Sequence, residues 1–103
     1  MGEMGYVSSG LLAADAVIHA GGCLLGGCLV ISDGTNAVNL VLHDHASAAS
    51  GTKVAELGVG ASPATGALTQ GMWFGDKGVQ CVNGIYADIT QATGTIKFYV
   101  WYR

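Results

Sequence analysis

Apolar and polar residues alternate over short stretches of this chain, and glycine, asparagine, aspartate or serine repeatedly breaks the alternation. Apolar residues do not recur at the helical spacing i, i+3, i+4, i+7 over any long glycine-free stretch. Alternation with a period of two is typical of β-strands that bury one face. The pattern therefore predicts strands at residues 16–20, 23–32, 36–45, 53–59, 78–90 and 95–103.

The predicted strand at residues 23–32 is apolar on both faces. With uninterrupted alternation, one face carries Leu24, Cys28 and Val30, and the other carries Cys23, Leu25, Leu29 and Ile31. Such a strand is typically covered on both sides, so we expect Leu24 and Val30 to contact another subunit. Gly26-Gly27 predicts a bulge or a close approach of another group to the backbone.

The last predicted strand has two different faces. Tyr99 and Trp101 point to one side, between Lys97 and Arg103. Large rings rarely stand exposed without a partner, so we expect these two to be interface residues. The opposite face is expected to pack on the core, and it consists of Ile96, Phe98, Val100 and Tyr102.

Two segments predict turns or loops with different roles. Asn83-Gly84 lies between apolar runs, which is a strong signal for a β-hairpin that would pair Val82 with Ile85 and Cys81 with Tyr86. Residues 60–71 are expected to form a loop that leads into Met72-Trp73-Phe74. Trp73 and Phe74 either plug the core, anchor a neighbouring subunit or provide a platform for a sugar.

These elements predict an all-β fold, namely an antiparallel β-sandwich or a jelly-roll-like single domain over residues 16–103. Residues 1–15 contain several glycines and serines and are expected to form an extended N-terminal arm that can reach a neighbouring subunit.

Charged residues make up only 11% of the chain, against about 25% in typical soluble proteins. A domain of 103 residues keeps much of its surface in water, so the low charge indicates that other subunits cover part of it. The four scattered cations do not form the basic stripe that nucleic-acid binding requires. No apolar stretch is long enough to span a membrane, and the N-terminus lacks the basic region of a secretory signal.

Few residues are candidates for chemistry. His43 and His45 are spaced to share one face of a strand and form a weak candidate metal site with two visible ligands. The alternative is a polar strand end that runs into a loop. No nucleophile–base signature or phosphate-binding loop is present, so we expect neither an enzyme nor a cofactor.

Three cysteines, Cys23, Cys28 and Cys81, are an odd number and include no CxxC pair. We expect small buried thiols that need no disulfide for folding, since a protein made in a reducing cytoplasm keeps its thiols reduced. The alternatives are a Cys23–Cys81 or a Cys28–Cys81 bridge that forms later in an oxidising medium.

Four segments carry a resemblance to a known class of proteins: LVISDGTN at residues 29–36, VNLVLHD at 38–44, ASAASGTK at 46–53 and GVQCVNGIY at 78–86. In this order they resemble a family of small bacteriophage virion proteins. The resemblance implies a β-sandwich that assembles as a homotrimer or larger oligomer. It also implies a role as a head decoration (cement) protein, or as a neck or tail component.

The first functional hypothesis is therefore a structural virion protein, synthesised in the host cytoplasm, that binds the major capsid protein or other virion subunits. Its expected interface residues are Tyr99, Trp101, Trp73, Phe74, Leu24 and Val30. The alternative is a lectin-like carbohydrate-binding module that uses Trp73 and Phe74. A glycan array separates the two hypotheses.

Overall fold

The computed structural model describes residues 5–32, 37–59, 69–91 and 96–103. Within these ranges the chain is all β, as predicted, and contains no helix. The strands are β1 (Val7–Ser8), β2 (Ala16–Ala20), β3 (Cys23–Ile31), β4 (Val38–Asp44), β5 (Thr52–Val59), β6 (Thr69–Trp73), β7 (Val79–Cys81), β8 (Gly84–Gln91) and β9 (Lys97–Tyr102). Residues 60–68 of the predicted loop, and the first residue of the strands predicted at residues 36–45 and 95–103, lie outside the described residues.

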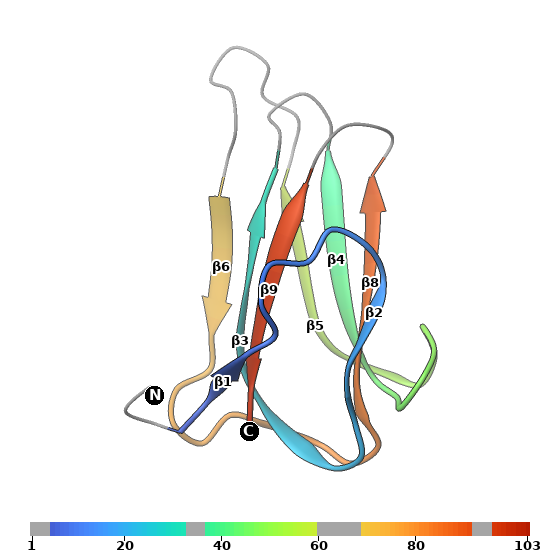
Figure 1. The fold of residues 1–103 in the computed structure, drawn as a ribbon, viewed down its shortest axis with the longest axis vertical. Helices are drawn as coiled ribbons and strands as arrows, with labels where there is room; N and C mark the ends of the chain where they lie inside the picture. The colour runs from blue at the N-terminus through green and yellow to red at the C-terminus, as the bar shows by residue number, and fades with distance from the viewer. Residues whose placement is uncertain (1–4, 33–36, 60–68, 92–95) are drawn as a thin grey trace.

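Two antiparallel sheets pack together (Figure 1). Sheet A has the strand order β1-β9-β3-β6, and β7 also pairs with β3. Sheet B has the order β2-β8-β4-β5. Apolar residues from the inner faces of both sheets form one buried cluster between them. Phe98, Leu25, Leu40, Leu42 and Ile85 are its largest members.

The strand pairs are nested around the turn between β4 and β5. Moving outward along the chain, the pairs are β4–β5, β3–β6, β2–β8 and β1–β9, and successive pairs alternate between sheet B and sheet A. The two ends of the described chain therefore lie side by side, with Val7 opposite Tyr102.

The predicted alternation in β4 and β9 is confirmed. Val38, Leu40 and Leu42 of β4 are buried in the core, and so are Phe98 and Val100 of β9. Tyr99 and Trp101 lie on the opposite face of β9 and are only half-buried.

In β3 the alternation changes face at a β-bulge. The pairing of β3 with β9 shifts between Leu25 and Gly27, so Gly26 is the additional residue. Cys23 and Leu25 are buried before the bulge, and Cys28 and Val30 are buried after it. The predicted bulge is thus present, but the predicted division of β3 into two uninterrupted faces is wrong, because the inserted residue moves every later side chain to the other face.

The two glycines of the bulge lie directly under aromatic rings. A Cβ atom on Gly26 would lie 2.7 Å from the ring of Tyr6, and a Cβ atom on Gly27 would overlap the ring of Trp73. Only a residue without a side chain allows a ring to approach the backbone this closely. The predicted close approach is therefore also confirmed.

Asn83-Gly84 does not form the predicted hairpin. β7 belongs to sheet A and β8 to sheet B, and Cys81 pairs with Cys23 while Ile85 pairs with His19. The hairpin turn expected of Asn-Gly requires positive φ at both residues. Gly84 has a φ of 142°, but no described residue other than glycine has a positive φ. The chain instead crosses from one sheet to the other at this point.

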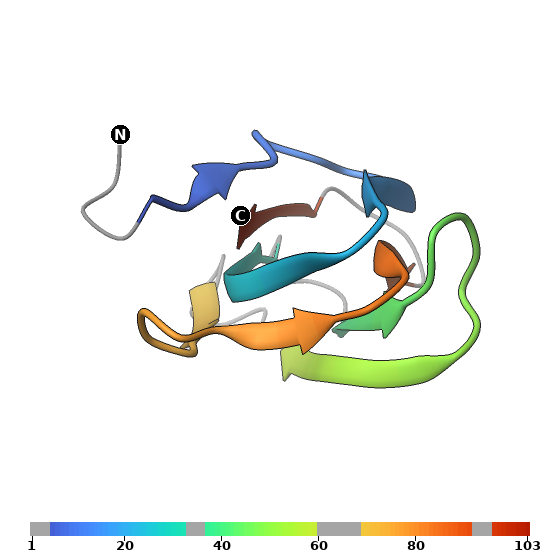
Figure 2. The same cartoon turned by 90° about the horizontal axis from the view of Figure 1, so that it is seen from below.

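The predicted extended N-terminal arm is not confirmed, because the described part of this segment pairs with strands of its own chain. β1 pairs with β9, and the backbone of Leu12 exchanges two hydrogen bonds with that of Phe98. The segment then crosses over to sheet B, where β2 pairs with β8 (Figure 2). The unpaired edge of β9 explains this arrangement, because its backbone groups need partners.

We predict that Gly27→Ala destabilises the protein by about 1–3 kcal/mol, because the added methyl group collides with the Trp73 ring and with the carbonyl oxygen of Met72. Gly22→Ala is the matched control, since a Cβ atom there meets nothing closer than 3.4 Å. Urea unfolding of both variants measures the effect. Equal stability of the two variants would show that Trp73 does not lie on Gly27.

Candidate functional site

The outer face of sheet A carries three large aromatic side chains. Trp73 of β6 and Trp101 of β9 both lie opposite Gly27 of β3, and Tyr99 of β9 lies opposite Leu29 in the adjacent row. Residues directly opposite each other in an antiparallel pair project to the same side. We call Trp73, Tyr99, Trp101 and Leu29 the aromatic face.

The rings of this face contact one another. Tyr99 and Trp101 are stacked, with ring centroids 5.6 Å apart and an interplanar angle of 16°. Trp73 meets Trp101 edge-to-face at 6.4 Å. Trp73 nevertheless keeps 53% of its surface exposed, and it is the largest exposed hydrophobic side chain among the described residues. Patches of this kind on one face typically mark a contact site.

Tyr6 closes one end of the aromatic face. Its ring meets Trp73 edge-to-face at 5.6 Å, and its hydroxyl donates a hydrogen bond of 3.0 Å to the carbonyl oxygen of Gly75. The guanidinium of Arg103 lies over the Tyr6 ring, 4.6 Å from the centroid, and also donates to the carbonyl oxygen of Asp76. These contacts hold the Tyr6 ring against Trp73.

The structure brings three of the six predicted interface residues together, namely Trp73, Tyr99 and Trp101. Trp73 lies in β6, which begins at Thr69, so the predicted loop at residues 60–71 is wrong for its last three residues. Phe74 packs against the core cluster, which is the first of the three roles predicted for it, a plug of the core. Val30 has no exposed surface and lies in the core, so its assignment as an interface residue is wrong and follows from the shift at the bulge. Leu24 is half-buried beside the backbone of Arg103.

The sequence prediction missed two contributors to this site, Tyr6 and Leu29. Tyr6 lies in the predicted arm, where no alternation exists to assign it a face. The alternation in the sequence puts Leu29 on the face opposite to Val30, but it does not reveal the aromatic neighbours of Leu29. Gly26-Gly27 was the one available signal for an aromatic contact, because adjacent glycines in an apolar strand indicate that another group lies close to the backbone.

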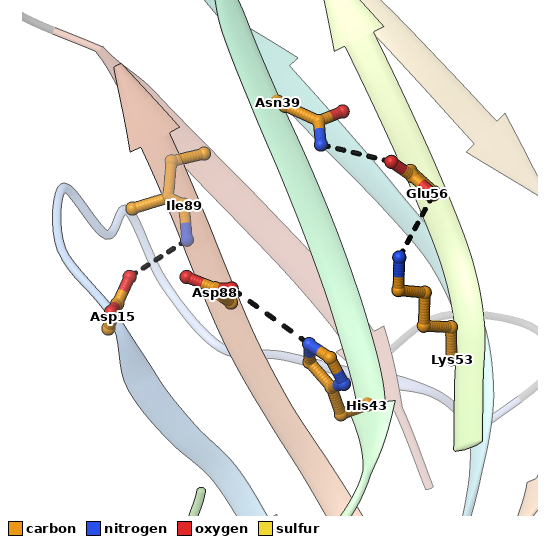
Figure 3. Close-up of polar contacts among 7 residues, drawn as sticks. All are labelled: Asp15, Asn39, His43, Lys53, Glu56, Asp88 and Ile89. Atoms are coloured by element: carbon orange, nitrogen blue, oxygen red, sulfur yellow. Dashed lines mark hydrogen bonds and ion pairs between the residues drawn. The ribbon is translucent and has the colours of Figure 1, made fainter. Parts of the chain in front are cut away.

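Polar contacts join several residues of sheet B and of the segment before it (Figure 3). Glu56 of β5 accepts a hydrogen bond from the side-chain amide of Asn39 and lies 3.8 Å from the ammonium group of Lys53. Both members of this ion pair are exposed, so its contribution to stability is about 0–1 kcal/mol. The carboxylate of Asp15 accepts a hydrogen bond from the backbone of Ile89 and ties the start of β2 to β8.

The structure does not bring His43 and His45 together on one strand face. β4 ends at Asp44, and the Nδ1 atom of His45 accepts hydrogen bonds from the backbone N–H groups of Ser47 and Ala48. His43 is buried, with its Nε2 atom 3.9 Å from a carboxylate oxygen of Asp88 and no hydrogen bond to either ring nitrogen. Among the described residues, no group of three or more potential metal ligands is present.

Asp44 holds the crossing between β7 and β8. Its carboxylate accepts hydrogen bonds from the backbone N–H groups of Asn83 at 2.7 Å, Val82 at 3.1 Å and Gly84 at 3.3 Å. These bonds, that of Asn83 above all, lower the pKa of Asp44 below its usual 3.8. No local pattern in the sequence indicates these partners of Asp44, which lie about 40 residues further along the chain.

The three cysteines are buried and free, as predicted. Cys28 lies between Met72 and Val100 in the sheet, away from Cys81, so the alternative of a Cys28–Cys81 bridge is wrong. Burial raises the pKa of the Cys28 thiol to about 11.

Comparison of the chain with protein-family models, with characterised proteins and with solved structures gives no match. The part of the chain that the structure describes contains no helix long and apolar enough to cross a membrane.

We predict that Asp44→Ala destabilises the protein by on the order of 1 kcal/mol at neutral pH, because three backbone donors lose a charged acceptor. The lowered pKa of Asp44 means that its contribution is present above pH 3.8 and is lost as the pH falls through the folded-state value. Thermal melting as a function of pH measures both effects. The difference between wild type and variant should shrink on acidification, and a difference that grows would contradict this role.

Proposed function

We propose that this protein is a structural subunit of a bacteriophage particle, a decoration protein that stabilises the head by binding at seams between other subunits. The observation that carries the proposal is the aromatic face, with three large rings on the outside of one sheet. Tyrosine, tryptophan and arginine are the residue types enriched at the energetic centres of interfaces. The resemblance of the sequence to small virion proteins points to the same class.

The size and composition of the surface support a protein partner. A standard interface covers about 800 Å² on each partner, or roughly one sixth of the 5117 Å² that this chain exposes. Two charged side chains flank the aromatic face: Lys97 lies opposite Ile31, and Arg103 lies over the Tyr6 ring at the other end. An apolar centre with little charge is the arrangement found in the buried part of protein interfaces.

The nested strand pairing supports the finer proposal of a jelly roll. With β7 set aside, eight strands form two four-stranded sheets in which paired strands alternate between the sheets. Jelly rolls of this kind are found in viral capsid and lectin domains. Because a fold alone does not define a function, the aromatic face carries the functional argument.

The proposed partners are further copies of this chain, as a trimer, and the major capsid protein. In this proposal the protein is made in the host cytoplasm and ends in the virion. If the protein lies in the neck or tail instead of the head, the same aromatic face binds a different partner. Labelling of the protein in intact phage particles shows which of these positions it occupies.

The packing of the rings favours a protein partner over a sugar. A platform for a sugar needs free ring faces together with hydrogen-bonding groups around them. Tyr99 and Trp101 each turn one face to the other ring, so only one face of each ring is left for a sugar. A specific hit on a glycan array would reverse this preference.

We predict that Trp101→Ala weakens assembly by about 2 kcal/mol or more and leaves the subunit folded, because Trp101 points away from the core. Phe98→Ala should instead lower the free energy of unfolding by roughly 3–5 kcal/mol, because its ring is fully buried. Thermal melting measures folding, and incorporation into phage particles measures assembly.

The matched control is Tyr86→Ala, which removes a half-buried ring from the outer face of sheet B. It should assemble like the wild type. If Tyr86→Ala and Trp101→Ala impair assembly equally, the aromatic face is not the docking surface. If Trp101→Ala unfolds the subunit, the ring belongs to the fold and the proposed role is wrong.

A further inference from the structure

Cys23 and Cys81 occupy directly opposite positions in the short antiparallel pair formed by β3 and β7. Opposite residues in such a pair have Cα atoms about 4.5 or 5.5 Å apart, depending on the hydrogen-bonding pattern. A disulfide requires Cα atoms about 4.4–6.8 Å apart. Either type of pair therefore meets the requirement without movement of the backbone.

The two side chains also point the same way. Both belong to the buried cluster between the sheets, and residues directly opposite each other in an antiparallel pair project to the same side. Cys28 does not compete for this pairing, because it lies five residues along β3 from Cys23, which is about 16 Å at the rise of a strand.

We propose that Cys23 and Cys81 form an intramolecular disulfide in the folded protein when it meets a small-molecule disulfide such as oxidised glutathione. The protein folds with both thiols reduced, and it gains a covalent link between β3 and β7 under oxidising conditions. This proposal does not depend on the proposed function, and either can fail without the other.

The reaction proceeds in two exchange steps. The Cys23 thiolate attacks a sulfur of oxidised glutathione, forms a mixed disulfide and releases one glutathione thiolate. The Cys81 thiolate then attacks the Cys23 sulfur, which closes the protein disulfide and releases the second glutathione. Two protein thiols are oxidised, one small disulfide is reduced to two thiols, and the two protons from the cysteines balance the charge.

The order of the steps follows from access. Cys23 is 7% exposed and Cys81 is fully buried, so the reagent reaches Cys23 first. Burial raises the pKa of Cys23, and burial together with the neighbouring Cys23 raises that of Cys81 to about 12. Since the thiolate is the reacting form, exchange is slow at neutral pH and faster near pH ~9.

The bridge would close a loop from Cys23 to Cys81 that contains more than half of the chain. Linking residues so far apart restricts the unfolded chain strongly, and we expect the melting temperature to rise by on the order of 10 °C. The folded structure should change little, because the link joins residues that are already paired.

The experiment treats the full-length protein with oxidised glutathione under native conditions, near pH ~9, and quenches free thiols with an alkylating reagent. Peptide mass mapping identifies the link, and thermal melting with and without reductant measures its effect. Cys28→Ser keeps the pair and serves as the matched control for Cys23→Ser and Cys81→Ser, each of which removes one partner.

The expected result is a chain without links to other chains that has lost two hydrogen atoms, contains a peptide linking Cys23 to Cys81 and melts at higher temperature. Cys28→Ser should behave in the same way. Cys81→Ser should stop at a mixed disulfide on Cys23, and Cys23→Ser should not react, because Cys81 is fully buried. The proposal is overturned if native protein keeps all three thiols, if only links between chains form, or if the link appears only in denatured protein.

Discussion

The contact of two aromatic rings with the bare backbone of β3 is the constraint on which much of this structure depends. Gly26 and Gly27 carry no side chains, and the rings of Tyr6 and Trp73 occupy the space that a Cβ atom would fill. The same pair of residues creates the bulge that turns the second half of β3 over. One local feature thereby seats the N-terminal segment, positions Trp73 beside Trp101, and directs Cys28 and Val30 into the core.

The strands were the part of the fold most readily predicted from the sequence. β4 and β9 carry apolar residues at every second position on one face, and burial of that face determines both the element and its orientation. The turn at Asn83 was not predictable in this way, because Asp44 lies far away in the sequence and holds all three backbone N–H groups of the crossing. A local signal for a hairpin was thus overridden by a distant carboxylate.

The candidate site was predictable in its residue types but not in its assembly. Tyr99 and Trp101 were identified because they share the outer face of a strand whose inner face is apolar. Trp73 was singled out as an aromatic residue, but its place beside Trp101 follows from the order of β6, β3 and β9, which no local pattern encodes. Val30 was assigned to the wrong face, because a pattern with a period of two cannot reveal on which side of a bulge the register resumes.

The nested pairing of strands has a consequence for how the chain reaches this structure. Val7 pairs with Tyr102, and Leu12 with Phe98, so the outermost contacts join residues separated by nearly the whole sequence. Closing such long loops costs entropy before any contact is gained, and folds dominated by distant pairs therefore form slowly. During synthesis on a ribosome, β1 has no partner until β9 has emerged. Sheet A is therefore completed late, and β1 stays unpaired until then.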